Sequence, residues 1–123
     1  MTDLYTEAKA LQNELTRHRR WLHAHPGVAF DIAETVEYVR RELESLGLSP
    51  APCGRAGLTA TIGSGKPCIL LRADMDALPI GEQVDVPFKS RHEGVMHACG
   101  HDAHTAMLLA TIKWLKDHEA QLR

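Results

Sequence analysis

The apolar run CILLRA at residues 68–73 constrains the fold of this chain more than any other segment. A strand without alternating polar residues is typical of a sheet that is buried on both faces. The β-branched run at 58–62 precedes it across a glycine- and proline-containing turn at 63–67, so we predict that the two strands form a hairpin. Residues 77–98 are broken by prolines and glycines and are expected to be irregular. A buried strand that is followed by a helix needs a further parallel strand, which indicates the opening part of a larger α/β domain.

Helical periodicity precedes these strands. Leucines and alanines recur at helical spacing over residues 3–24, which predicts a first helix. A second helix is predicted over 32–46, with one apolar stripe formed by Ile32, Val36, Val39, Leu43 and Leu46. Asp31 and Glu34 are predicted as a capping box at its start, and Gly47 closes its end.

The bulk composition excludes several classes of protein. The chain has 123 residues, a net charge of −2 and 44% hydrophobic residues, which is typical of one globular domain at most. The absence of a basic patch and the scarcity of aromatic residues argue against nucleic-acid binding, and no apolar run is long enough to span a membrane. A polar, acidic N-terminus and three widely spaced cysteines fit a cytoplasmic protein best.

The densest cluster of metal-binding and proton-transferring side chains is MHACGHDAH at residues 96–104, before a final helix predicted to begin near Ala103. Cys99 and His101 are two residues apart, and in an extended backbone such side chains point to the same side. Cysteine thiolates and histidine imidazoles are both zinc ligands, so the pair could share one divalent ion. Equally, Cys99 could be a buried apolar residue and His101 a hydrogen-bonding group at the start of the helix. Three neighbours could support a metal site: His97, Asp102 and His104.

Two carboxylates, Asp74 and Asp76, directly follow the apolar strand. Open α/β sheets bind their ligands at the carboxyl ends of strands, so this pair could bind a metal or orient a ligating histidine. The alternative is a simple turn, in which aspartate is common. The histidines His18, His23 and His25 belong to the first helix and its end, where such residues more often cap, pack or face water than bind a metal.

Three segments occur together in a familiar order: WLHAHP at 21–26, LRADMDALPI at 71–80 and GVMHACGHDAH at 94–104. They closely resemble the metal-dependent N-acyl-amino-acid amidohydrolases, which include hippurate hydrolases, bacterial aminoacylases and auxin-conjugate hydrolases and are related to metallo-carboxypeptidases. The resemblance implies a zinc-peptidase-like domain with three α/β/α layers and a mostly parallel mixed sheet, incomplete in this chain. Residues 1–123 are then expected to be the N-terminal portion of the catalytic domain, without the dimerisation domain and the C-terminal catalytic part.

The same resemblance implies roles for individual residues. It implies a centre of two divalent metal ions, zinc or manganese, in which Cys99 and His101 are ligands. Asp76, the predicted catalytic residue, corresponds to the carboxylate that the family places beside the metals, and Asp74 stands where carboxypeptidase relatives carry a metal-binding histidine. The implied reaction is hydrolysis of the amide bond of a small N-acyl amino acid, such as an N-acetyl or N-benzoyl conjugate, to a carboxylate and a free amino acid. The full-length protein is expected to be a homo-oligomer, and its substrate-binding residues are not identified.

Family members carry their general base, within a Glu–Glu pair, and two further metal-binding histidines beyond the part that resembles this chain. We therefore expect residues 1–123 to be inactive alone. A metallo-dipeptidase or carboxypeptidase is an alternative, although the Cys-Gly-His form argues against it. The pattern is also compatible with a non-catalytic metal-binding or interaction module, and with a split protein whose sheet is completed by a second polypeptide.

Overall fold

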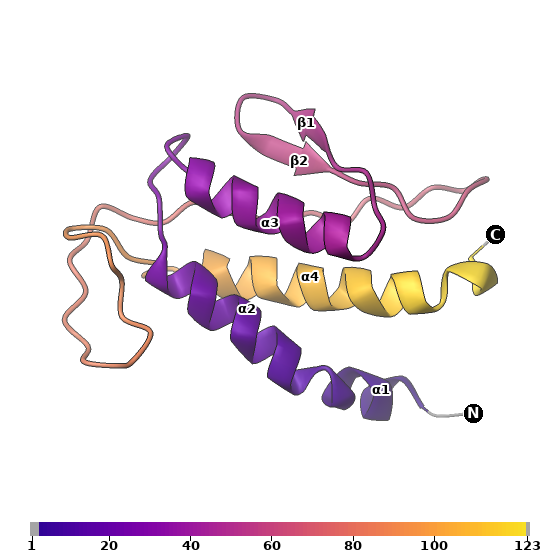
Figure 1. Ribbon diagram of the computed structural model, residues 1–123, viewed down its shortest axis with the longest axis horizontal. Coiled ribbons are helices and arrows are strands. Elements are labelled where there is room, and N and C mark those ends of the chain that lie inside the picture. The colour runs from indigo at the N-terminus through magenta and orange to yellow at the C-terminus, as the bar shows by residue number, and fades with distance from the viewer. Residues whose placement is uncertain (1–2, 123) are drawn as a thin grey trace.

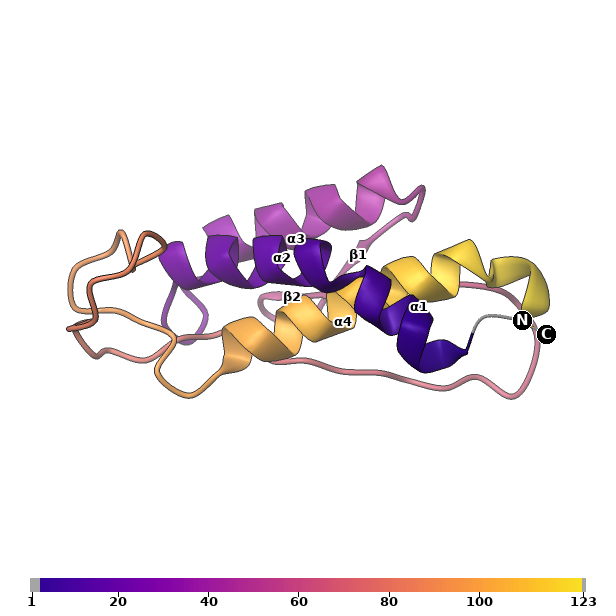
Figure 2. The ribbon, with the colours of Figure 1, turned by 90° about the horizontal axis from the view of Figure 1, so that it is seen from below.

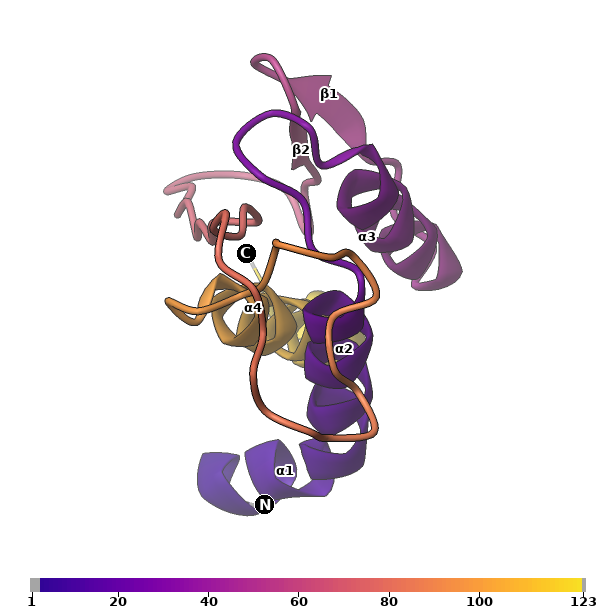
Figure 3. The same ribbon diagram turned by 90° about the vertical axis from the view of Figure 1, so that its left-hand side faces the viewer.

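The computed structural model describes residues 3–122, in which helices pack beside a small hairpin (Figure 1). The elements in chain order are α1 (Leu4–Ala10), α2 (Gln12–Ala24), α3 (Ala33–Ser45), β1 (Ala51–Cys53), β2 (Gly57–Thr59), α4 (His101–Asp117) and the 3-10 helix η1 (Glu119–Gln121). Helix α4 packs mainly against α2 and more lightly against α3 (Figures 1 and 3). Within the described residues, no helix is both long enough and apolar enough to cross a bilayer.

The helix predicted over 3–24 is divided in two at Leu11. This residue has φ −87° and ψ 3°, and its N–H bonds the carbonyl of Ala8 at 3.1 Å, three residues back instead of four. The tighter turn ends α1 before α2 begins. The predicted end of the helical region is confirmed, because α2 ends at Ala24 and His25 is its C-cap.

Helix α3 confirms the predicted helix over 32–46 to within a residue at each end, but its predicted capping box is wrong. The N-cap is Ile32, which makes no side-chain capping bond, and Asp31 is exposed. The Glu34 carboxylate instead pairs with His92, 2.9 Å from its Nε2. The predicted C-terminal signal is confirmed, since Gly47 adopts φ 78°, a left-handed conformation that glycine reaches without the steric cost of a Cβ.

The hairpin predicted between 58–62 and 68–73 is wrong. Strand β2 pairs antiparallel with the preceding β1, with Pro52 opposite Leu58. The turn between these strands contains Gly54 at φ 61°. Because this glycine turn comes just before β2, β2 pairs with the strand that precedes it and not with the apolar run that follows.

The apolar run 68–73 is extended but pairs with no strand among the described residues. Its predicted burial on both faces is also wrong, because Ile69 is 81% and Leu70 83% exposed. A strand is buried on both faces only when neighbouring strands and two covering layers enclose it. No element within residues 3–122 encloses this run in that way, so its side chains face solvent.

The hydrophobic core lies where α3, β2 and α4 meet. Val39 and Leu43 of α3 contact Leu109 of α4 in a buried cluster that Leu48 completes. Half-buried side chains from the surrounding segments pack against this cluster: Tyr38, Leu46, Leu58, Ile62, Met75 and Ile112. The α3 stripe predicted from periodicity therefore does face the core, and it fixes α4 relative to the N-terminal helices.

A buried histidine in α2 makes the stability of the folded chain depend on pH. His18 is 3% exposed, and its Nδ1 lies 2.8 Å from the Tyr38 hydroxyl. Burial, and then the charge of Arg17, lowers the pKa of His18 below its ordinary value of 6.5. Burial also raises the pKa of Tyr38 to about 12, so the hydroxyl stays protonated beside the ring.

We predict that His18→Gln weakens the pH dependence of folding. Below pH 6.5 the unfolded chain takes up a proton at His18 while the folded chain resists it. Stabilisation by the neutral ring is therefore complete above the unfolded pKa and is lost as the pH falls through the folded pKa. Urea unfolding at a series of pH values from about 7.5 to about 5 should show a shallower fall in unfolding free energy for the variant than for the unmodified protein. Equal slopes would contradict the assignment.

Candidate metal centre

The candidate metal centre forms where the segment after the apolar run meets the N-terminus of α4. This segment runs alongside α4 and ends near the helix start (Figure 2). The Thr105 hydroxyl of α4 donates to the carbonyl of Asp74 at 2.7 Å, and the Ala77 N–H donates to the carbonyl of Gly27 at 2.7 Å. These two bonds hold Asp74 and Asp76 in place from opposite sides.

His101 is the first residue of α4, because Gly100 acts as the N-cap with φ 111° and ψ 14°. This left-handed conformation strongly favours glycine, which explains why a glycine separates the cysteine from the histidine. The final helix therefore begins two residues earlier than predicted. Cys99 and His101 lie on either side of a sharp turn and not in one extended segment, so the alternation argument for their common direction does not apply.

The imidazole of His101 is held by the backbone and side chain of Asp76. Its Nδ1 lies 2.9 Å from the Asp76 carbonyl oxygen and 3.0 Å from Oδ1 of the same residue. Both partners are acceptors, so Nδ1 carries the hydrogen and Nε2 of the neutral ring keeps its lone pair. Nε2 is 3.6 Å from Oδ2 of Asp74, beyond hydrogen-bond range. A carboxylate that fixes the tautomer and direction of an imidazole in this way is the usual support of a metal-binding histidine.

The other predicted site residues differ in exposure and in their partners. Asp74 Oδ1 is paired with Nη1 of Arg72 at 2.5 Å, and Cys99 is exposed in the turn before Gly100. His104 is exposed one turn into α4, with its ring centroid 5.5 Å from that of His101.

His97 is 5% exposed, and neither of its ring nitrogens has a hydrogen-bond partner among residues 3–122. Burial lowers the pKa of His97, which favours the neutral ring. Asp102 is 2% exposed and is bonded to α2, so it is a structural anchor of the site and is not free to bind a metal.

The donors brought together here fit part of the ligand set of a divalent metal ion. They are the His101 imidazole with a free Nε2 and the nearby Asp74 carboxylate, both ligand types that zinc accepts. The Cys99 thiol is exposed and does not form a three-ligand group with them among the described residues. The part of the chain that the structure covers contains no group of three or more His, Cys, Asp or Glu side chains that could hold a metal by itself. A cavity of about 1360 Å³ lies between α3, β2, α4 and the apolar run at 68–73, and it reaches Asp74, Asp76 and His101. Most of its lining is apolar.

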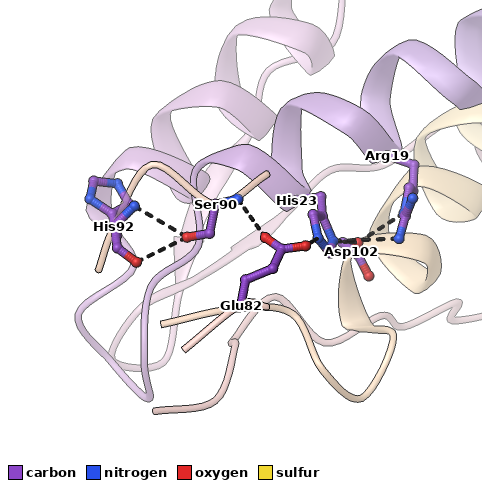
Figure 4. A network of polar contacts seen from close by, with 6 residues as sticks. All are labelled: Arg19, His23, Glu82, Ser90, His92 and Asp102. Carbon is purple, nitrogen blue, oxygen red and sulfur yellow. Dashed lines mark hydrogen bonds and ion pairs between the residues drawn. The ribbon is translucent and has the colours of Figure 1, made fainter. Parts of the chain in front are cut away.

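Sequence reasoning missed a second group of polar residues behind this site. His23 of α2 lies between two carboxylates, with Nδ1 2.7 Å from Asp102 and Nε2 2.7 Å from Glu82 (Figure 4). Arg19 and Ser90 extend the group at its two ends (Figure 4). His23 and Asp102 are 79 positions apart in the sequence, so no local spacing could have linked them. The only sequence feature that pointed to His23 was its place in the WLHAHP segment, one of the three segments that carry the family resemblance.

A histidine that an aspartate holds by Nδ1 at the start of a helix has the support that is usual for a metal-binding histidine. Comparison with protein families matches residues 70–123 to the peptidase family M20/M25/M40. The chain is 46% identical over 107 residues to IAA-amino acid hydrolase ILR1-like 5 of Arabidopsis thaliana, covering 85% of this chain and 25% of that protein. It is 42% identical over 119 residues to N-acetylcysteine deacetylase of Bacillus subtilis, covering 94% of this chain and 31% of that protein.

Among solved structures, the fold matches a Bacillus subtilis protein described as a dinuclear metal-binding peptidase from the M20 family. The TM-score is 0.84 at 41% identity, covering 92% of this chain and 33% of that one. Residues 70–123 thus match the peptidase family M20/M25/M40, and the two relatives above are named as a hydrolase and a deacetylase. The α/β class predicted from the sequence is thereby confirmed. The chain spans about a quarter to a third of the length of these relatives.

Proposed function

We propose that this chain contributes to a metal-dependent amidohydrolase that cleaves small N-acyl amino acids, such as N-acetyl or N-benzoyl conjugates, to a carboxylate and a free amino acid. The observation that carries the proposal is the clamped imidazole of His101, whose Nε2 is left free next to Asp74. The names of the two relatives, an IAA-amino acid hydrolase and an N-acetylcysteine deacetylase, support this substrate class.

In this proposal each site residue has a defined role. His101 and Cys99 each donate one ligand atom to a pair of divalent ions, zinc or manganese, and Asp76 holds the imidazole in the tautomer that leaves Nε2 unprotonated. Such ions, when bound, lower the pKa of a bound water and polarise the amide carbonyl. The mostly apolar lining of the adjoining cavity suits the acyl part of the substrate.

The dinuclear description of the Bacillus subtilis structure supports a centre of two ions, and the choice between zinc and manganese belongs to the proposal. The described residues supply only part of a ligand set, so we also propose that residues 1–123 do not turn over substrate by themselves.

The test is hydrolysis by the natural protein, purified with added zinc or manganese and assayed on N-acetyl and N-benzoyl amino acids and on unblocked dipeptides. We expect release of free amino acid from the N-acyl substrates, loss of activity on chelation and recovery on adding metal. Preference for dipeptides would favour a peptidase instead, and activity that survives chelation would contradict the metal mechanism. Turnover by a polypeptide of residues 1–123 alone would contradict its proposed dependence on further ligands.

A further inference from the structure

We infer that the buried group Arg19, His23, Glu82 and Asp102, here called the α2–α4 ion network, positions His101 for metal binding. This inference rests on the proposed metal centre and assigns to its support residues that lie outside the ligand set. Asp102 directly follows His101 in the first turn of α4, so whatever fixes Asp102 also fixes the start of the helix that carries the ligand.

The α2–α4 ion network is enclosed by protein. The side chains of Asp102, Glu82 and His23 are 1%, 3% and 5% exposed, and only Arg19, at 37%, reaches the surface. Phe88 covers the group, with its ring centroid 5.1 Å from the Arg19 guanidinium carbon and 5.7 Å from the His23 ring centroid. Charges that are buried to this extent persist only when they are paired, which makes the geometry of the group specific.

Both ring nitrogens of His23 have a carboxylate partner in the α2–α4 ion network. Each ring nitrogen of His23 lies 2.7 Å from a carboxylate oxygen, and a carboxylate only accepts, so the ring donates from both sides as the imidazolium does. Arg19 Nη2 lies 3.4 Å from His23 Nδ1, a contact too long to compete with the shorter bond to Asp102.

Both oxygens of Asp102 are used. Oδ2 accepts from Nε of Arg19 at 3.0 Å and from His23, while Oδ1 accepts from the backbone N–H of Ala103 at 2.9 Å. The carboxylate therefore joins helix α2 to the first backbone turn of α4. His101 lies between this anchor and the Asp76 contact on its ring, so the ligand is held at its backbone and at its imidazole by separate groups.

Glu82 lies at the other end of the α2–α4 ion network. Its second oxygen accepts from the N–H of Ser90 at 2.5 Å, which ties down the loop that leads to Cys99 (Figure 4). Although burial opposes its ionisation, the bonds from Ser90 and His23 together hold the pKa of Glu82 below its usual value. Glu82 thus shares burial, charge and a histidine partner with Asp102, but it is remote in sequence from His101.

This pair allows a matched test in the natural protein. Asp102→Asn and Glu82→Gln each replace a buried carboxylate on His23 by the amide of the same shape. In Asp102→Asn the amide NH₂ must face either Ala103 N–H or the Arg19 and His23 donors, so one link to α4 is lost. In Glu82→Gln the amide oxygen can still accept from Ser90 N–H, and its NH₂ can donate to His23 Nε2 once the ring has given up the proton on that nitrogen. The bond from His23 Nδ1 to Asp102 then stays in place.

The measurement is zinc affinity by chelator competition, with the unfolding free energy of the metal-free protein as the second readout. We expect Asp102→Asn to weaken zinc binding by about 10- to 100-fold and Glu82→Gln by less than about threefold, even where both lower stability. Cobalt-substituted protein should report the same difference through changed visible absorption bands in Asp102→Asn alone. If Asp102→Asn fails to fold, Arg19→Gln, which removes only the outer contact to the same oxygen, should weaken zinc binding by about three- to tenfold.

Unchanged zinc affinity in folded Asp102→Asn or in Arg19→Gln would overturn the positioning role. Losses of affinity that track the loss of stability equally in Asp102→Asn and Glu82→Gln would also overturn it, since the network would then be only structural. If the unmodified protein binds no zinc or manganese, the metal centre fails and this role fails with it. If it binds zinc but hydrolyses no N-acyl amino acid, the proposed function fails while the positioning role stands.

Discussion

Replacing His101 by glutamine should lower hydrolysis of N-acyl amino acids by about a thousandfold in the natural protein. Glutamine has no ring nitrogen to replace Nε2, and the carboxamide cannot be held by Asp76 in the same direction. A catalytic metal contributes several kcal/mol to transition-state stabilisation, and each 1.4 kcal/mol is about tenfold in rate, so loss of a ligand has an effect of about this size. The measurement is kcat/KM at saturating metal, together with the number of zinc ions bound.

His118→Gln is the matched control. It makes the same substitution at the opposite end of α4, where His118 stacks on Trp114 with ring centroids 4.1 Å apart and contacts no predicted ligand. Its activity should stay within about threefold of the unmodified protein, because surface contacts of this kind contribute little. An active His101→Gln variant that binds its full complement of metal would exclude His101 as a ligand.

Replacing Leu109 by alanine should lower the unfolding free energy by about 2–5 kcal/mol, the usual cost of removing a buried leucine side chain and leaving a cavity. Leu109 is 3% exposed and joins α4 to Val39 and Leu43 of α3. Urea denaturation followed by circular dichroism measures the change, and the midpoint should fall without a change in slope.

Met107→Ala serves as the control because Met107 lies two residues away on the same helix and is 49% exposed. It should change the unfolding free energy by less than about 0.5 kcal/mol. Equal losses in the two variants would mean that α4 does not pack on α3 through Leu109 as described.

The helices could be predicted from the sequence because their cause is local. The apolar stripe of α3 and the left-handed Gly47 at its end follow from spacing and from glycine's freedom alone, and both predictions are confirmed. The capping box failed because Glu34 found a partner 58 positions away in His92, and such a contact leaves no mark in local spacing.

Strand pairing could not be predicted in the same way. An apolar run indicates that a segment can be buried, but the strand that pairs with it is set by elements distant in the sequence. The run at 68–73 has the composition of a central strand, yet no described strand pairs with it. The nearby Gly54 turn decided the pairing of β2 instead.

Some features of the candidate site could likewise be predicted from the sequence, and others could not. The family resemblance implied that Asp76 lies beside the metal centre, and in the structure its Oδ1 lies 3.0 Å from Nδ1 of His101. The role of Asp76 stays a prediction. The shared binding of a metal by Cys99 and His101 stays a prediction. The roles of His23 and Glu82 could not be predicted, because they depend on the packing of α2 against α4 and on a loop without regular structure.

The solvent-facing leucines and isoleucine of the apolar run have a consequence for biosynthesis. Ile69 and Leu70 belong to a short apolar segment that lies between the positive charges of Lys66 and Arg72. This segment is exposed while the polypeptide is still on the ribosome. Such a stretch collapses onto another nascent chain unless a chaperone binds it or later strands cover it. Coexpression of a chaperone should therefore raise the yield of soluble protein.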